Sequence, residues 1–166
     1  MNAYIYNADS NQVMINEAKR LLKNMNITQV ESLSEADIAI APFLTKKLSK
    51  EIISVPRYGT LIFHPSLLPR HRGKDAIKWA FKLQERYTGV TWFWASESYD
   101  TGDICEQEVV AIQEGETPWN FYTRAVVPVA MRTLRRVLFD IQHNIIRRIP
   151  QYEEHASYEP PFETKK

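Results

Sequence analysis

The sequence has almost no cysteine and no apolar run long enough to cross a bilayer. Its single cysteine, Cys105, excludes a disulfide framework and argues against a cysteine-based metal site. No apolar run approaches roughly 18 residues, so no membrane span is expected. The first residues lack the basic and long apolar segments of a signal peptide. These absences predict a cytoplasmic protein with neither a membrane partner nor a metal.

Excess charge of either sign is also missing. The chain carries 21 Lys and Arg against 20 Asp and Glu, a net charge of +1, so nucleic acid is an unlikely main partner. Its 166 residues, 44% of them hydrophobic, predict one domain with a substantial core. We place this domain at residues 1–150 and a proline- and charge-rich surface extension at 151–166. The composition leaves a homo-oligomer possible.

Apolar patterns alternate between strand and helix periods along the chain. They predict strands at 3–6, 27–30, 37–41, 60–63, 89–95 and 104–112, and helices at 11–25, 44–53, 76–84 and 117–144, the last bent at Pro128. This order is typical of a Rossmann-like α/β fold, with a mostly parallel sheet and helices on both faces. Ligands of such sheets bind beyond the carboxyl ends of the strands.

Two polar loops each follow a predicted strand. Residues 64–73 read HPSLLPRHRG, and residues 99–103 read YDTGD. His64 and Asp100 would meet in one cleft if the strands are neighbours, and such a pair handles protons. Asp100 would orient the imidazole, and the pair would protonate a leaving nitrogen, deprotonate an amine or water, or stabilise an oxyanion. Ordinary turn chemistry explains the same residues, and residue chemistry alone leaves both interpretations open.

Three motifs in order resemble the formyltransferase family that uses 10-formyltetrahydrofolate. They are HPSLLPRHRG at 64–73, TGVT at 88–91 and DTGDI at 100–104. The 36-residue interval from His64 to Asp100 matches the family spacing. The motifs are most similar to the hydrolase domain of 10-formyltetrahydrofolate dehydrogenase, and they also resemble methionyl-tRNA and glycinamide ribonucleotide formyltransferases.

The resemblance implies transfer of a formyl group from 10-formyltetrahydrofolate to a small amine, with His64 and Asp100 catalytic and no metal. It places the pteridine between the loops 43–48 and 95–100, and the implied binding residues are Phe43, Leu44, Leu48, Ala95, Ser96, Glu97, Ser98 and Asp100. Weaker candidates for substrate contact or loop support are Ile62, Ser66, Arg70 and Arg72. The two arginines would bind an anionic acceptor or the glutamate tail of folate, or else lie on a solvated loop face.

Ile62 departs from the family pattern, which has Asn two residues before the catalytic His. An amide there donates to the developing oxyanion, and one such donor contributes roughly 3 kcal/mol to transition-state binding. Ile62 cannot donate, which favours hydrolysis to formate and tetrahydrofolate as the alternative reaction, unless another group stabilises the oxyanion. Ser98 also stands where the family often has Gly.

The N-terminal half is a second departure. Only 63 residues precede His64, fewer than the family usually has, and residues 7–11 contain no glycine. A phosphoribosyl acceptor is disfavoured, because phosphate cradles rely on close backbone approach. No C-terminal barrel follows, which disfavours tRNA. The shortened half also favours a third hypothesis, a weakly active folate-binding module.

Overall fold

A mixed six-stranded sheet forms the centre of the computed structural model, which describes residues 1–6, 11–44 and 46–162. The strands are β1 (Asn2–Ile5), β2 (Thr28–Val30), β3 (Ile38–Ala41), β4 (Thr60–His64), β5 (Tyr87–Trp94) and β6 (Ile104–Ala111). Their order is β2-β1-β3-β4-β5-β6. The first four strands in this order are parallel, which confirms the mostly parallel sheet. At one edge, β5 runs antiparallel to both of its neighbours, β4 and β6. The antiparallel edge was not predicted from the sequence.

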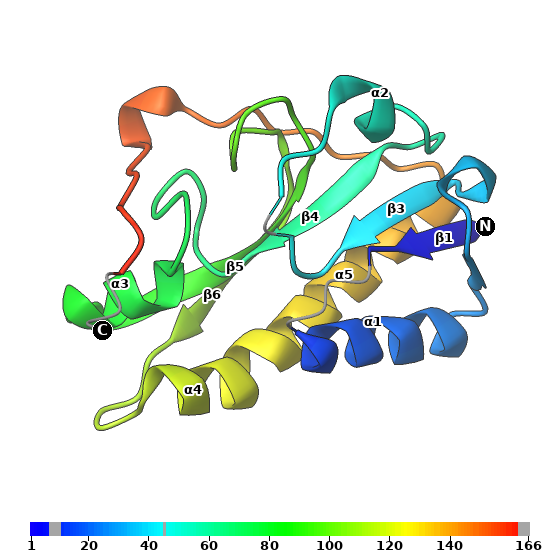
Figure 1. Ribbon diagram of the computed structural model, residues 1–166. Coiled ribbons are helices and arrows are strands. Elements are labelled where there is room, and N and C mark those ends of the chain that lie inside the picture. The colour runs from blue at the N-terminus through cyan, green and yellow to red at the C-terminus, as the bar shows by residue number, and fades with distance from the viewer. Residues whose placement is uncertain (7–10, 45, 163–166) are drawn as a thin grey trace.

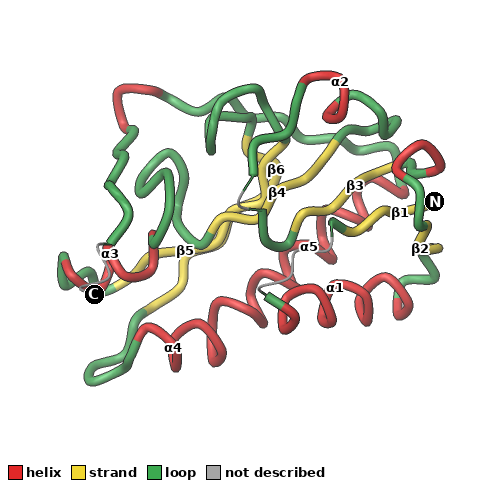
Figure 2. The backbone as a smooth tube through the Cα atoms, in the orientation of Figure 1, coloured by secondary structure: helices red, strands yellow, loops and turns green. Residues whose placement is uncertain are grey.

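Helices lie on both sides of the sheet. They are α1 (Gln12–Asn24), α2 (Lys50–Ile53), α3 (Ala76–Lys82), α4 (Pro118–Phe121) and α5 (Val127–Gln142), with 3-10 turns η1 (Leu33–Glu35) and η3 (Glu153–His155). The helices α1, α4 and α5 run along one side, and the short α2 lies on the other, as Figures 1 and 2 show. None of the helices in the described part of the chain is long and apolar enough to cross a membrane.

The side chains of β4 alternate between two faces of the sheet, as the period of two requires. Leu61 and Phe63 enter the main core beneath α1 and α5. Thr60, Ile62 and His64 therefore point to the opposite face. That face carries the candidate site described below.

The three aromatic residues at 92–94 divide between the same two faces. Trp92 and Trp94 are buried in the main core, as the sequence predicted, and Phe93 packs on the other face with Leu68 and Ile104. The indole N–H of Trp92 donates to the Ala130 carbonyl at 2.9 Å. Trp94 similarly donates to a carbonyl at residue 147, so neither buried indole lacks a partner.

The helix predicted at 44–53 is wrong over most of its length. Only α2 forms, and Ser49 precedes it in an extended conformation (φ −75°, ψ 160°) with its hydroxyl accepting from the Ile52 N–H. Leu44, Leu48 and Ile52 have helical spacing, but the cap at Ser49 interrupts the helix between them. Residues 46–48, directly before Ser49, form a loop instead.

The long C-terminal helix begins at Pro118 with Thr117 as its N-cap, as predicted, and changes pitch before Pro128. The Thr117 hydroxyl caps the Asn120 N–H at 3.2 Å. Between α4 and α5, the π-helical turn η2 (Tyr122–Val126) bonds the Val127 N–H to the Tyr122 carbonyl, five residues back. The wider turn accommodates the missing N–H of Pro128, so the predicted bend takes the form of a π turn.

Cys105 should be chemically inert in the folded protein. It lies on β6 with 3% of its surface exposed, and burial raises the pKa of its thiol to about 12. We expect a thiol-specific disulfide reagent to leave Cys105 unmodified at about pH 8 and to label it fully in denaturant, because the thiolate is the nucleophile. Rapid labelling of the native protein would contradict this burial.

Candidate functional site

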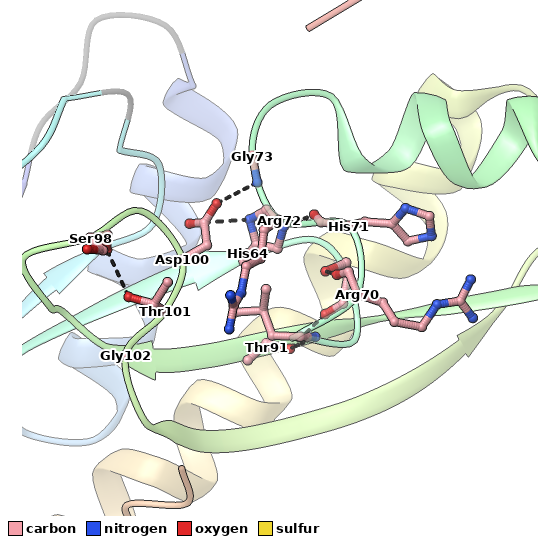
Figure 3. A network of polar contacts seen from close by, with 12 residues as sticks. His64, Arg70, His71, Arg72, Gly73, Thr91, Ser98, Asp100, Thr101 and Gly102 are labelled. Atoms are coloured by element: carbon pink, nitrogen blue, oxygen red, sulfur yellow. Dashed lines mark hydrogen bonds and ion pairs between the residues drawn. The ribbon is translucent and has the colours of Figure 1, made fainter. Parts of the chain in front are cut away.

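His64 is the last residue of β4, and a backbone carbonyl fixes its ring. The Nε2 atom lies 2.7 Å from the His71 carbonyl oxygen. A carbonyl only accepts, so Nε2 carries the proton and donates it. The other ring nitrogen, Nδ1, faces Asp100, whose Oδ1 lies 3.8 Å away (Figure 3). His64 is buried, with 6% of its surface exposed.

Asp100 reaches His64 from the far end of β5. Because β5 runs antiparallel to β4, Trp94 pairs with Leu61 rather than with His64. The loop after Trp94 therefore folds back over the sheet before it presents Asp100. Its Oδ2 then accepts a hydrogen bond of 2.7 Å from the Gly73 N–H. The structure thus brings together the two residues that the sequence paired.

A single hydroxyl holds the loop that follows His64. The Thr91 hydroxyl donates to the Ser66 carbonyl at 2.7 Å and accepts from the Leu68 N–H at 3.3 Å. Gln107 donates to both the Thr91 hydroxyl and the Leu68 carbonyl, each at 2.8 Å. The fully buried Ser66 donates to the Arg70 carbonyl at 2.6 Å, which closes the loop on itself.

Neither Thr91 nor Gln107 was assigned a role from the sequence. The only sequence signal that pointed to Thr91 was the TGVT motif at 88–91, one of the three motifs of the family resemblance. Its Gly89 gives room to Leu67, because a Cβ there would come within 2.3 Å of the Leu67 Cδ2. The motif therefore supports the loop, and its Thr91 lies directly opposite His64 in the β4–β5 ladder.

Gly102, in the DTGD motif, lies against the backbone of β5. A Cβ on Gly102 would meet the Trp94 carbonyl oxygen at 1.7 Å, a distance that no relaxation of a side chain relieves. The close approach explains why the turn that carries Asp100 contains glycine.

Substitution of Gly102 should therefore be more costly than substitution of a glycine with free space. We expect Gly102→Ala to lower the free energy of unfolding by at least ~2 kcal/mol, because the backbone must move. Gly115→Ala is the matched control, since nothing lies near its Cβ position and only its positive φ opposes alanine, at about 1 kcal/mol. Urea denaturation measures both, and equal losses would contradict the clash.

Ile62 lies on the same face of β4 as His64. It is half-buried and packs against a small apolar cluster of Leu68, Phe93 and Ile104. Its side chain offers no hydrogen-bond donor beside His64. These apolar neighbours suit an isoleucine better than the asparagine of the family pattern.

The two loops expected to bind the pteridine border one hollow of about 600 Å³. The residues that line it are Lys47, Leu48, Ser49, Lys50, Glu51 and Glu97. Leu48 and Glu97 are thus brought together, and the Lys50 Nζ lies 3.7 Å from the Glu97 Oε1 across the hollow.

The other implied binding residues do not line this hollow. Phe43, Leu44, Ala95 and Ser96 are half-buried, and Ser98 is exposed. The backbone N–H groups of residues 96–99 donate to no atom within the described residues, so this loop has donors to offer. Residue 45 of the first loop lies outside the described part, as do residues 7–10, where the sequence lacks a glycine-rich loop.

The arginines of the first loop are both paired. Arg70 contacts the Glu85 carboxylate at 2.5 Å and stays largely exposed. Arg72 is 5% exposed and forms a bidentate pair with Glu153 at 2.7 and 2.8 Å. Arg72 therefore does not lie on a solvated loop face, and the C-terminal segment occupies its guanidinium.

His71, between these arginines, was not among the predicted site residues. It is 2% exposed, with Nε2 at 3.1 Å from Glu85 Oε1 and Nδ1 at 3.0 Å from Glu159 Oε1.

No group of three or more potential metal-ligating side chains comes together among residues 1–6, 11–44 and 46–162.

The chain belongs to the formyl transferase family, whose model matches residues 6–137. It is 37% identical over 124 residues to human cytosolic 10-formyltetrahydrofolate dehydrogenase, which covers 75% of this chain and 14% of the dehydrogenase. It is 33% identical to the methionyl-tRNA formyltransferase of Pelotomaculum thermopropionicum, over 87% of this chain and 45% of that enzyme. The chain therefore spans only a small part of the dehydrogenase that it matches.

The fold recurs in a solved structure. A crystal structure of HypX from Aquifex aeolicus superimposes with a TM-score of 0.82 at 23% identity, over 98% of this chain and 30% of HypX. This likeness confirms the α/β fold expected from the family resemblance.

Proposed function

We propose that this chain transfers the formyl group of 10-formyltetrahydrofolate to a small amine through His64 and Asp100. The observation that carries the proposal is the fixed pair: His64 Nδ1 and Asp100 Oδ1 face each other, while the His71 carbonyl and the Gly73 N–H hold their other atoms. The similar human protein is named for 10-formyltetrahydrofolate, and the similar HypX structure contains tetrahydrofolic acid. Both names support a folate donor.

The pair can perform the proton transfers that this reaction needs. In its doubly protonated form, His64 keeps its Nε2 proton on the His71 carbonyl and donates from Nδ1 to the formyl oxygen as negative charge develops there. Asp100 accepts the proton of the attacking amine and returns a proton to N10 as the bond from the formyl carbon to N10 breaks. The formyl carbon exchanges its N10 bond for a bond to the amine nitrogen, so protons and atoms balance.

The hollow beside Leu48 and Glu97 is our proposed place for the pteridine. It opens between the two loops that the family resemblance implied, and it has an apolar wall at Leu48. The backbone N–H groups of residues 96–99 would supply donors to the edge of the ring. A ring held there would present N10 toward the loop that carries Asp100.

Hydrolysis is the second candidate, and Ile62 is the observation that favours it. Water would replace the amine as nucleophile, and the products would be formate and tetrahydrofolate. Ile62 removes a donor that transferases of this family commonly have, and its neighbours Leu68 and Phe93 supply no replacement from their side chains. His64 would then be the main donor to the oxyanion.

The nucleophile can be determined by a turnover assay. We expect tetrahydrofolate release from 10-formyltetrahydrofolate to depend on an added amine, because an amine outcompetes water when it is bound and oriented. Release would be measured by absorbance with and without a panel of small primary amines. Amine-independent release would establish hydrolysis, and donor binding without any release would contradict both reactions.

The roles of the pair can be tested by substitutions that preserve the loop. His64→Ala and Asp100→Asn should each lower kcat at least ~100-fold, because each removes a proton-transfer group. An amide at position 100 still accepts from the Gly73 N–H, so thermal stability should change little. Asp103→Asn, in the same turn, is the matched control and should retain turnover. Near-normal turnover of Asp100→Asn would refute the mechanism.

A further inference from the structure

The C-terminal segment returns across both loops of the candidate site. We call residues 149–162 the C-terminal strap. It begins with a two-bond bridge between Ile149 and Ile104, at 2.8 and 2.9 Å. Near its end, the Trp79 indole donates to the Pro160 carbonyl at 2.8 Å, and the Phe162 N–H donates to the Asp75 carboxylate at 3.2 Å. Figure 1 shows it, in orange to red, on the side of the sheet that also carries α2.

Gln151 of the strap joins the two loops through one side-chain amide. Its Nε2 donates to the Asp100 carbonyl at 2.9 Å and to the Gly102 carbonyl at 2.7 Å. Its Oε1 accepts from the Arg72 guanidinium at 2.8 and 3.2 Å. Both donors and the acceptor are therefore engaged. One end of the amide holds the loop of Asp100, and the other holds the loop of His64.

The strap also bonds the backbone at Arg72 and in the residues just before it. The Arg72 N–H donates to the Ser157 carbonyl at 2.9 Å, and the His71 N–H donates to the Ser157 hydroxyl at 2.8 Å. In turn, the Ser157 N–H donates to the Pro69 carbonyl at 3.1 Å. The strap is thus fixed against the first loop independently of Gln151.

Strained backbone lies where the strap makes these contacts. His71 has φ +55° and Asp100 has φ +56°, a left-handed conformation that costs a residue with a Cβ. Such residues persist only where their surroundings hold them. The strap bonds to both: Ser157 at the His71 N–H and Gln151 at the Asp100 carbonyl. Of these two residues, His71 holds the ring of His64 through its carbonyl, and Asp100 is itself a member of the candidate catalytic pair.

We propose that Gln151 is a positioning residue that sets the placement of Asp100 relative to His64. The inference rests on the function proposed above, because it assigns no new reaction. Gln151 touches neither facing atom of the pair. It acts through the Asp100 backbone on one side, and on the other through Arg72, whose neighbours provide the His71 carbonyl and the Gly73 N–H.

Two substitutions at Gln151 distinguish a role in positioning Asp100 from a contribution to the overall stability of the fold. Gln151→Glu still accepts from Arg72, but its carboxylate oxygen faces the Asp100 and Gly102 carbonyls without a proton to donate. Gln151→Ala removes both connections. Glu153→Gln is the matched control: it weakens another strap contact of Arg72, on an exposed residue, and leaves the Asp100 loop untouched.

The first measurement is hydrogen exchange of the Gly73 amide, read by nuclear magnetic resonance. This N–H donates to Asp100 Oδ2, so its protection reports the placement of Asp100 without any reaction. We expect exchange at Gly73 to accelerate at least ~10-fold in both Gln151 variants, while amides of β4 keep their protection. Glu153→Gln should leave Gly73 within about twofold of wild type.

The second measurement is turnover. Both Gln151 variants should lower kcat roughly 10- to 100-fold with little change in KM for 10-formyltetrahydrofolate, because a misplaced catalytic group slows chemistry more than binding. Unchanged exchange at Gly73 in both variants would overturn the proposal, whatever the turnover. Faster exchange with unchanged kcat would also overturn it. A wild-type chain without turnover would refute the proposed function alone, and exchange at Gly73 would still test the strap.

Discussion

The backbone from His71 to Gly73 is the constraint on which the candidate site depends. Its carbonyl at His71 accepts from His64, and its N–H at Gly73 donates to Asp100, so three consecutive residues fix both members of the pair. Backbone groups suit this task because they have no rotamers of their own to order. Whatever holds this tripeptide therefore also holds the separation of 3.8 Å between Nδ1 and Oδ1.

Much of this arrangement could be predicted from the sequence, because it follows from local rules. The apolar run before His64 forms β4, the two tryptophans of β5 enter the core, and Thr117 caps the last helix. Asp100 was paired with His64 by motif and spacing, but its route was not foreseen, since an antiparallel β5 leaves no local signature. The burial of Arg72 was missed for a similar reason, because its partners lie about eighty residues later in the chain.

Arg72 also shows why the strap and the domain form one physical unit. A guanidinium that is 5% exposed is costly to bury unless it is paired and hydrogen-bonded, and both of its partners, Gln151 and Glu153, lie in the strap. The Arg72 guanidinium in turn holds the pKa of the Glu153 carboxyl below its ordinary value. A boundary at residue 150 would separate these partners, so the burial of Arg72 and the presence of the strap require each other.

The apolar surface around Ile62 leaves the site with fewer side-chain hydrogen-bond donors than a site with an asparagine at that position. An asparagine at this position would lie against Leu68, Phe93 and Ile104, where its polar atoms find no side-chain partner, whereas isoleucine satisfies that surface. In the proposed reaction, stabilisation of an oxyanion would then come mainly from His64. Its Nε2–H is already committed to the His71 carbonyl, so only Nδ1 of the doubly protonated ring would be free to donate. With one donor in place of two, the proposed catalysis would depend more strongly on where that donor points, and hence on the tripeptide and the strap that position it.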